Sequence, residues 1–453
     1  MEFTAIVKAI SGALWDNILL VLLCCTGIYF TLRLRFVQIV KFKDSFKKVF
    51  GGFRFKGKKA GKEGMSSFQA LTTAIAAQIG TGNIAGAATA VVSGGPGAIF
   101  WMWISAFFGM ATIFSEATLA QKFKTTVHGE VTGGPVYYIK AAFKGRFGRV
   151  LAALFAVFII LALGFMGNMV QSNSISEAFD IAFGMPSWIV GVFVALLAGF
   201  IFMGGIRRIA SVTEKLVPIM ALLYIVGSLI VIGVNYQHIG QAFVSIFVGA
   251  FRPEAVLGGA AGISVKMAVR YGVSRGLFSN EAGMGSTPHA HALAKVDHPC
   301  DQGVVALMGV FLDTFVVLTL TALTFLTTGA LSSGETGSKL AQVAFSSVFG
   351  HFGDIFVALC MFFFAFSTIV GWYFFGQTNI KYLFGAKAVK LYSAIVLIFI
   401  MVRSMLKVDL VWALSDLFNG LMVIPNLLAL LALSGLVSKL YKEYQQKKVI
   451  KSD

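Results

Sequence analysis

The stretch Gln78-Ile79-Gly80-Thr81-Gly82-Asn83-Ile84-Ala85-Gly86 lies in the middle of a long apolar segment that covers residues 66–92. Glycine weakens a helix and removes the side chain that keeps a ligand away from the backbone. Gly80 and Gly82 therefore predict that this helix is discontinuous. A glycine face used only for helix packing is the alternative. Polar groups at membrane depth are costly, however, and the same turn carries three of them: Gln78, Thr81 and Asn83.

A discontinuous helix makes backbone groups available as ligands. The free amides of Gly80, Thr81 and Gly82 would begin a new half-helix, where the local dipole favours a carboxylate. Carbonyl groups before the break, such as those of Ala76 and Ile79, would be free to coordinate a cation. The sequence here predicts a carboxylate site beside a cation site.

The composition is that of a membrane protein. Of the 453 residues, 57% are hydrophobic and 13% are charged, and the mean hydropathy is +0.82. A soluble chain of this length would carry about 25% charged residues. Apolar segments long enough to cross a bilayer recur along the chain, so we expect an all-α polytopic membrane protein with eleven spans. They cover residues 14–32, 66–92, 97–120, 150–171, 187–204, 214–234, 257–290, 303–329, 353–376, 390–406 and 411–435.

The basic residues predict the orientation of these spans. With the N-terminus outside, the cytoplasmic segments hold 29 Lys and Arg and the outside segments hold five. Because cytoplasmic loops are the basic ones, we expect an outside N-terminus and a cytoplasmic C-terminus. The net charge of +17 lies mainly in short loops between spans. It therefore indicates topology signals and contact with anionic lipid rather than nucleic-acid binding.

The second and seventh spans are long and rich in glycine, and each begins a group of five spans. Because five is odd, the two groups have opposite orientations, which is the inverted-repeat plan of secondary transporters. We expect an added N-terminal helix, a basic cytoplasmic segment, two five-helix repeats with discontinuous first and sixth core helices, and a basic cytoplasmic tail. They cover residues 1–33, 34–64, 65–235, 236–436 and 437–453.

The seventh region has two glycine-rich candidates for its break, residues 258–262 and 276–286. The second contains more polar groups and is favoured, with a cytoplasmic connecting loop as the alternative. Phe278, Ser279 and Asn280 in this stretch are candidate substrate contacts.

Span nine carries adjacent hydroxyls on Ser367 and Thr368. Together with the carbonyl groups before the first break, they would complete an oxygen cage for Na+. The alternative is that both hydroxyls bond to carbonyl groups one turn back, which is common in membrane helices. Trp372 follows Thr368 by four residues, lies on the same helical face and would wall a pocket.

Glu116 and Asp313 lie deep in spans three and eight without a basic residue nearby in sequence. Acids at membrane depth are functional candidates, and they leave proton coupling open as an alternative to Na+, besides a purely structural role. Asn168, Gln171 and Asn173 would face a central cavity or end the fourth span.

The remaining reactive residue types predict no catalytic chemistry. His289 and His291 lack a third ligand in view, so a metal centre is not expected there. The four cysteines have no ligand spacing and are expected as small apolar residues. No nucleophile elbow, P-loop or HExxH pattern is found in the sequence. We therefore expect neither an enzyme nor ATP-driven transport, and no cofactor.

The stretch Gly94-Gly95-Pro96-Gly97-Ala98-Ile99-Phe100-Trp101-Met102-Trp103, followed by Gly109, resembles the alanine/glycine:cation symporter family, also called sodium:alanine symporters. Residues 78–86 and 276–286 agree with it, and the resemblance runs from about residue 65 to 430. It implies uptake of alanine or glycine driven by Na+ or H+, in a plasma membrane. It also implies a fold similar to that of the bacterial leucine transporter, with a ten-helix core of two inverted repeats.

The resemblance also assigns residues to roles. Gly80-Thr81-Gly82-Asn83 matches the stretch that holds the substrate carboxylate. The Na+ ligands fall at Ala76, Ile79, Phe364, Ser367 and Thr368.

We therefore expect a Na+ symporter of a small neutral amino acid that works by alternating access. The substrate ammonium would meet Gln78 or Thr368, and Phe278 and Trp372 would limit the side-chain pocket. A channel is a further alternative.

Overall fold

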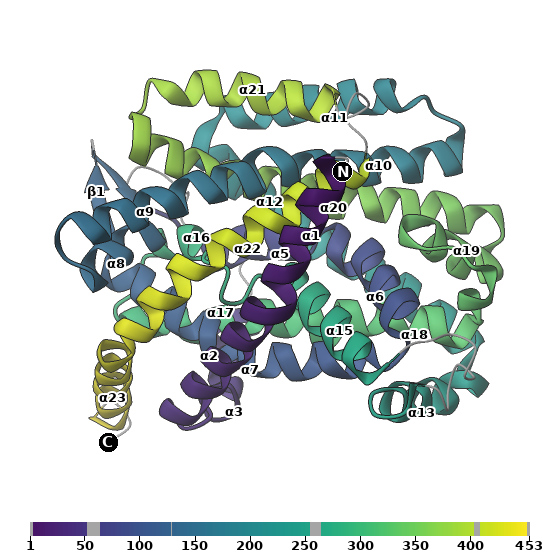
Figure 1. The fold of residues 1–453 in the computed structure, drawn as a ribbon, viewed down its shortest axis with the longest axis horizontal. Helices are drawn as coiled ribbons and strands as arrows, with labels where there is room; N and C mark the ends of the chain where they lie inside the picture. Colours follow the sequence, from purple (N-terminus) through teal and green to yellow (C-terminus); the bar gives the residue numbers. More distant parts are fainter. Residues whose placement is uncertain (1–2, 52–63, 128, 254–263, 403–407, 451–453) are drawn as a thin grey trace.

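The computed structural model is a bundle of helices and describes residues 3–51, 64–127, 129–253, 264–402 and 408–450 (Figure 1). A helix satisfies its own backbone hydrogen bonds, which is what a chain needs when lipid surrounds it. The N-terminal helix is continuous from Phe3 to Arg33 and is followed by two short helices. The N-terminal helix consists of α1 (Phe3–Leu14), η1 (Trp15–Leu19) and α2 (Leu20–Arg33). The two short helices are α3 (Val37–Val40) and α4 (Phe42–Phe50).

The first glycine-rich span is broken, as predicted. Its two parts are bent by 49° at a gap of three residues. Ser66 begins the first part as a capping box, because its hydroxyl accepts the Gln69 amide at 3.0 Å. The parts are α5 (Ser67–Gln78), then η2 (Gly82–Gly86) with α6 (Ala87–Gly94).

The rest of the first half contains long helices and one small hairpin. Strands β1 and β2 pair antiparallel, with Thr125 opposite Thr132. Residues Gly145–Phe183 form one unbroken helix, longer than the predicted span. The elements are α7 (Ala98–Lys122), β1 (Thr125–Val127), β2 (Glu130–Thr132), α8 (Pro135–Ala142), α9 (Gly145–Ile159), η3 (Ile160–Gly167), α10 (Asn168–Phe183), α11 (Ser187–Met203), α12 (Gly205–Val234), η4 (Tyr236–His238) and α13 (Ile239–Gly249).

The second half begins, after the undescribed residues 254–263, with a helix that ends in an irregular segment. This segment, residues 281–287, separates α15 from the short α16. The elements are α15 (Val265–Asn280), α16 (Pro288–Ala292), α17 (Pro299–Val310), η6 (Phe311–Leu318), α18 (Thr319–Thr328), η7 (Ala330–Ser333), α19 (Gly337–Phe349), α20 (His351–Phe384), α21 (Ala388–Val402), α22 (Val408–Ala432) and α23 (Ser434–Ile450).

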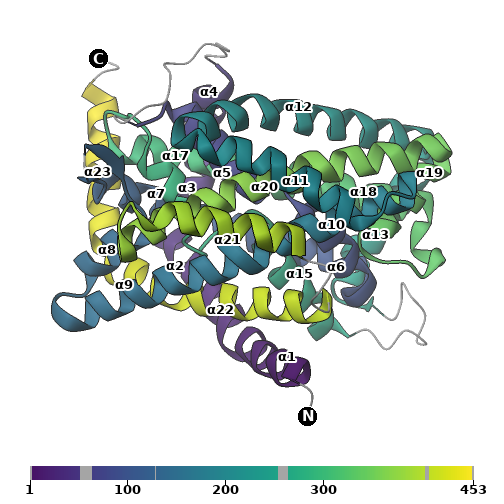
Figure 2. The same cartoon turned by 90° about the horizontal axis from the view of Figure 1, so that it is seen from above.

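The helices are arranged around α5 and α20, which lie in the interior (Figures 1 and 2). Helices α11 and α21 pack together and form an outer layer at the top of Figure 1. The hairpin, α8 and α23 lie at one end of the bundle, and α13 and α19 lie at the other (Figure 2).

The described residues contain seven helices that are long and apolar enough to cross a membrane, or eight when the bent pair is one span. Helices α11 and α21 are shorter apolar helices, and α15 carries Lys266, Arg270 and Arg275. The chain is therefore a multi-pass helical membrane protein. The count of eleven spans, the five-plus-five layout and the division into five segments stay predictions.

Segments that were predicted to share the cytoplasmic side contact one another. Lys48 Nζ lies 2.7 Å from Asp301 Oδ1, and the Tyr444 hydroxyl donates to the same oxygen at 3.1 Å. Lys381 Nζ lies 3.0 Å from Glu130 Oε2. These contacts agree with a common side for the basic segments, while the direction in which that side faces stays a prediction.

Two ion pairs join α15 to neighbouring helices away from these basic segments. Arg270 Nε lies 2.6 Å from Asp16 Oδ1 of the N-terminal helix. Arg275 bonds both carboxylate oxygens of Asp416 on α22, at 3.3 and 3.4 Å. Trp15 donates to the Asp416 carbonyl at 3.0 Å. We call the two pairs the α15 ion pairs.

Candidate functional site

The first break lies against two other helices because it is built from glycine. The position of a Cβ on Gly82 is 3.2 Å from the Ser279 Cα of α15, and a Cβ on Gly80 would overlap Thr368 Oγ1 of α20. The absence of these side chains lets three helices meet at one point. As the sequence predicted, the break therefore lies next to Ser279 and Thr368.

Two backbone amides of this break are held by neutral side-chain carbonyl groups. The Gly80 amide donates to Asn83 Oδ1 at 3.0 Å, and the Thr81 amide donates to Gln171 Oε1 at 3.2 Å. The expectation that these amides are free was therefore wrong, because buried amides need partners. The buried Thr81 Oγ1 and Gln78 Oε1, in contrast, have no hydrogen-bond partner among the described residues.

Five oxygen atoms come together where α20 crosses the end of α5. Ser367 Oγ donates to the carbonyls of Ala76 and Phe364 at 3.2 and 2.8 Å. Thr368 Oγ1 lies 3.0 Å from each of the same two carbonyls and 3.4 Å from that of Ile79. The structure thus brings together all five residues expected at the Na+ site. Both hydroxyls also bond to the Phe364 carbonyl one turn back, which is the alternative that the sequence analysis gave for them.

The chemistry of this oxygen group fits a hard cation. Hydroxyl and carbonyl oxygens without nitrogen or sulfur are the ligands that such ions prefer. All five residues are at most 1% exposed, so a cation held here would be shielded from bulk water. We call this set the oxygen group.

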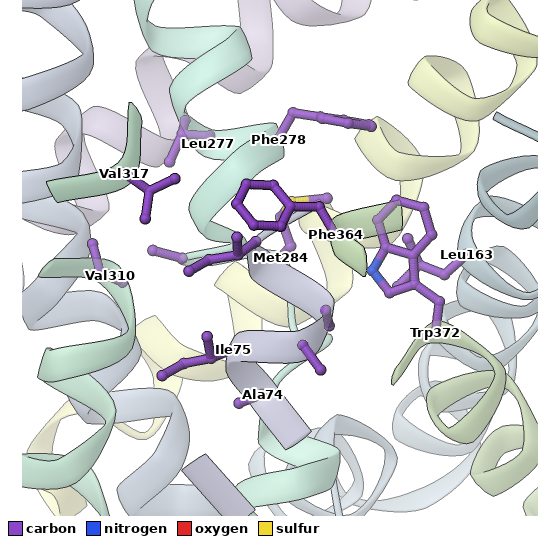
Figure 3. Close-up of a cluster of buried hydrophobic side chains, with 14 of the residues drawn as sticks. Ala74, Ile75, Leu163, Leu277, Phe278, Met284, Val310, Val317, Phe364 and Trp372 are labelled. Atoms are coloured by element: carbon purple, nitrogen blue, oxygen red, sulfur yellow. The ribbon is translucent and has the colours of Figure 1, made fainter. Parts of the chain in front are cut away.

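An aromatic wall stands beside the oxygen group. Phe278, Phe364 and Trp372 belong to one cluster of buried side chains (Figure 3). The rings of Phe278 and Trp372 meet edge to face at 6.2 Å. Gly167 of η3 lies directly against the Trp372 ring, where a larger residue would not fit. Phe278 and Trp372, which the sequence analysis expects to limit the side-chain pocket, thus lie in contact with each other; their role in limiting a substrate stays a prediction.

Asp313 ties the first break to the end of α15. Its Oδ1 accepts from Asn83 Nδ2 at 2.7 Å and from Ser279 Oγ at 2.9 Å, and its Oδ2 accepts from Thr314 Oγ1 at 2.8 Å. Asn280 Nδ2 bonds to the same Thr314 hydroxyl at 3.1 Å. Asn83, Ser279 and Asn280 are thus already engaged with other side chains.

Gln78 belongs to the same region but faces a different partner. Its Nε2 donates to the Asn280 carbonyl at 2.7 Å. The last turn of α5 is therefore fixed to the last turn of α15 by a side chain predicted to bind substrate.

The second break lies at residues 281–287, later than expected. Residues 276–280 belong to the helix α15. Gly276 does not end this helix; because it has no side chain, α15 packs closely on Ser105 and Met102 of α7. The predicted break at 276–286 is therefore only partly right. The other candidate, residues 258–262, lies outside the described residues.

A buried carboxylate organises the second break. Glu116 of α7 accepts the amides of Gly283 and Gly285 at 3.0 and 2.9 Å, and also Asn426 Nδ2 at 2.7 Å. Asn426 additionally donates to the Gly283 carbonyl at 2.9 Å. Glu116, singled out in the sequence, thus acts as a support for this loop.

Glu281 is a residue that the sequence reasoning missed. It has a positive φ of 56°. Its Oε1 accepts from Trp372 Nε1 at 2.5 Å and its Oε2 from Ser286 Oγ at 2.5 Å. The signal available in the sequence was an acid directly after the polar Ser279-Asn280 pair.

The two histidines are buried rather than placed in an exposed loop. His289 Nε2 lies 2.8 Å from Asn379 Nδ2, and His291 Nδ1 lies 2.9 Å from Gln302 Nε2. Among the described residues, no group of three or more His, Cys, Asp or Glu residues is placed to hold a metal ion.

A multi-pass helical bundle whose broken helix meets an oxygen group and a buried aromatic wall has the features of a membrane transporter that binds its ligands between helices. The sequence comparison names the group more closely. The sequence model of the Sodium:alanine symporter family matches residues 1–453, and this chain belongs to that family. It is therefore a Na+-coupled amino-acid symporter rather than an enzyme, Na+ is its coupling ion, and no cofactor is indicated.

Several named relatives match nearly the whole chain. The sodium/alanine symporter AgcS of Methanococcus maripaludis is 41% identical over 453 residues, covering 98% of each chain. The probable sodium/glutamine symporter GlnT of Bacillus subtilis is 41% identical, covering 98% of this chain and 91% of the relative. The amino-acid carrier protein AlsT of the same organism is 38% identical, covering 98% and 93%.

A solved structure shares the fold at low sequence identity. The manganese transporter of Eremococcus coleocola superposes with a TM-score of 0.52 at 14% identity, over 78% of this chain and 74% of that one. This likeness concerns the fold alone, and it agrees with the leucine-transporter-like fold that the resemblance implied.

Proposed function

We propose that this protein imports alanine or glycine together with Na+ by alternating access. The observation that carries the proposal is the oxygen group, in which Ser367 and Thr368 of α20 meet the Ala76 and Ile79 carbonyls beside a break in α5. Na+ bound there would join two helices that are otherwise linked through hydroxyl bonds.

The substrate carboxylate binds at the first break. The amides of Gly80 and Thr81 are held there by neutral carbonyl groups of Asn83 and Gln171. A carboxylate forms stronger hydrogen bonds than a neutral carbonyl and can replace them. The unpartnered Thr81 hydroxyl lies next to this position and supplies a further donor.

The substrate side chain faces the aromatic wall. We expect Phe278 and Trp372, whose rings meet edge to face at 6.2 Å, to limit the side chain to a small group. Glu281 fixes the indole ring by its hydrogen bond. The ammonium group meets Gln78 or Thr368, whose oxygens lie at the end of α5. A neutral, short amino acid satisfies these conditions, in keeping with a relative named a sodium/alanine symporter.

Coupling follows from the place of the cation. Na+ at the oxygen group stabilises the conformations in which α5 and α20 are joined, and a ligand shifts a conformational equilibrium only through such a difference in affinity. The sodium gradient then drives accumulation of the substrate.

Uptake of radiolabelled alanine into proteoliposomes tests the proposal. We expect accumulation with an inward Na+ gradient and none when K+ replaces Na+. Excess unlabelled alanine or glycine should abolish it, whereas glutamine should compete weakly. Uptake driven by a pH gradient without Na+ would instead favour the proton-coupled alternative.

Ser367→Ala sharpens the test, because it removes one oxygen from the oxygen group. The Na+ concentration for half-maximal uptake should rise about tenfold, the effect of losing roughly 1.4 kcal/mol of binding. The KM for alanine at saturating Na+ should change much less.

The matched control is Thr327→Ala on α18, where a buried hydroxyl bonds to the Leu323 carbonyl one turn back. It should leave Na+ activation unchanged. Unchanged Na+ activation in Ser367→Ala would show that the oxygen group is not the Na+ site.

A further inference from the structure

A cavity lies apart from the site described above. It has a volume of about 1040 Å³ and lies between the β1–β2 hairpin, α8 and the facing ends of α11, α20 and α21. None of the residues of the oxygen group or of the first break lines it. This cavity, which we call the hairpin cavity, therefore needs an explanation of its own.

The hairpin cavity is positively charged. Three lysines line it, Lys140, Lys381 and Lys390, against one carboxylate, Glu130. Three positive charges and one negative charge leave a net charge of +2. Since Glu130 pairs with Lys381 at 3.0 Å, the excess charge is carried by Lys140 and Lys390.

The arrangement around Lys140 is typical of a side chain at a membrane surface. Its ammonium lies 5.2 Å from the ring centre of Tyr382 and 5.8 Å from that of Tyr137. Tyrosine and lysine gather where the hydrocarbon of a bilayer gives way to headgroups. This arrangement is the one expected at headgroup depth, and the cavity is lined by Lys140, Lys381 and Lys390 of the predicted basic segments.

The opposite wall of the cavity is apolar and continues onto the lipid-facing surface. Met203, at the end of α11, lines the cavity and is 80% exposed. On the same helix, Phe200 and Leu196 are 60% and 69% exposed, and on α21 Leu391 is 67% exposed. Helices α11 and α21 form the outer layer of the bundle (Figure 1). A ligand with a charged head and an apolar tail fits this combination of walls.

We propose that the hairpin cavity binds the headgroup of an anionic phospholipid from the leaflet on the basic side of the protein. The phosphate lies between Lys140 and Lys390, and the acyl chains lie along α11 and α21. A soluble anion would bind the lysines but would make no contact with the apolar wall. A neutral lipid would contact the apolar wall but would not be attracted by the net positive charge.

The position of the cavity gives the lipid a route to the transport machinery. Lys381 and Ser367 belong to the same unbroken helix, α20. The phosphate competes with Glu130 for Lys381, and so loosens the hairpin from α20. Bound lipid thereby acts on the helix that carries three of the five oxygens of the proposed Na+ site.

Native mass spectrometry of the purified full-length protein tests the proposal by counting phospholipids that stay bound. The probes are phosphatidylglycerol and phosphatidylcholine of equal chain length. We expect retention of phosphatidylglycerol to fall at least tenfold in the double variant Lys140→Gln/Lys390→Gln, since one interfacial lysine contributes roughly fivefold. Retention of phosphatidylcholine should not change.

The matched control is Lys439→Gln/Lys442→Gln, which removes two exposed lysines of α23 outside the cavity. This control should keep its phosphatidylglycerol. A second variant, Lys140→Arg/Lys390→Arg, keeps the charge and should keep the lipid. Size-exclusion chromatography of each variant shows whether it folds, because a misfolded protein elutes at an altered volume.

Three results would overturn the proposal. Equal retention in the cavity variant and the wild type would exclude the lysines as the binding groups. An equal loss in the α23 control would indicate general charge attraction. Displacement of the lipid by inorganic phosphate at millimolar concentration, with phosphate binding lost in the cavity variant, would indicate a site for a soluble anion.

Discussion

The two breaks in the helices hold their backbone amides by different means. At the first break, residues 79–81, the partners are the neutral carbonyl groups of Asn83 and Gln171. At the second break, residues 281–287, the partner is the carboxylate of Glu116. Both breaks lie in the buried interior and both are rich in glycine, yet one uses neutral acceptors and the other a charge.

This difference indicates what each break can do. A neutral carbonyl is exchanged for the carboxylate of a ligand with a gain in hydrogen-bond strength. At the second break, the amides already bond to the carboxylate of Glu116, so a ligand carboxylate would gain no hydrogen-bond strength by replacing it. Removing Glu116 would leave these amides and Asn426 without an acceptor, which is costly. The first break is therefore suited to bind a ligand, and the second to hold the loop that carries Glu281 against Trp372.

The largest expected effect comes from removing the charged support. Glu116→Ala leaves two buried amides and the Asn426 amide without an acceptor, so we expect a loss of stability on the order of 3 kcal/mol or more. Thermal unfolding of the detergent-purified protein, followed by tryptophan fluorescence, measures it.

Ser115→Ala is the control for this change, because its hydroxyl bonds to the Ala111 carbonyl of the same helix. Its melting temperature should stay close to that of the wild type. Equal melting temperatures for the two variants would mean that Glu116 does not support the loop.

An intermediate effect is expected from placing a charge at the first break. Gln171→Glu offers the Thr81 amide a carboxylate of its own, which competes with that of the substrate. The KM for alanine should rise about tenfold at saturating Na+, corresponding to roughly 1.4 kcal/mol. Gln171→Ala removes the acceptor without supplying a charge and should raise the KM much less. If both variants raised it equally, Gln171 would serve only to pack the break.

The smallest effect is expected where the start of η2 packs against the end of α15. In Gly82→Ala the new methyl group lies 3.2 Å from Ser279 Cα, so one backbone must shift by a few tenths of an ångström. We expect a two- to threefold higher KM for alanine and a stability loss of about 1 kcal/mol. Gly233→Ala on α12, with nothing within 4 Å of its Cβ position, is the control. This control should lose no stability and keep its KM, because Ala favours the helix more than Gly does. If Gly82→Ala behaved in the same way, the contact with Ser279 would not limit the packing here.

The sequence was informative where the signal is local. Two glycines beside Gln78, Thr81 and Asn83 predict a break because the polar groups and the weak helix lie in one turn. The membrane class follows from composition in the same way. The hydroxyls of Ser367 and Thr368 and the freed carbonyls near the first break suggested a cation cage, but only the family resemblance added Phe364. Nothing in the spacing shows that Ser367 meets Ala76, 291 positions earlier.

The rest depended on contacts that are distant in the sequence. Gly276 looked like part of a break, but a glycine also allows helices to approach, and only the position of α7 decides between these roles. The partners of the first-break amides were unpredictable for the same reason, since Gln171 lies 90 positions away from Thr81. Glu281 was missed because its left-handed backbone conformation and its bond to Trp372 both arise from tertiary packing.

The α15 ion pairs have a consequence for how the sodium dependence of this protein is measured. Under the proposed alternating access, a movement of α15 away from α22 and the N-terminal helix would separate Arg275 from Asp416 and Arg270 from Asp16. All four side chains are partly exposed, so dissolved ions screen their attraction over about 8–10 Å at ordinary ionic strength. Sodium chloride would therefore act twice, as a source of the bound cation and as an electrolyte that eases this separation. A titration that holds ionic strength constant with choline chloride isolates the first action, and a titration that does not overstates the apparent affinity for sodium.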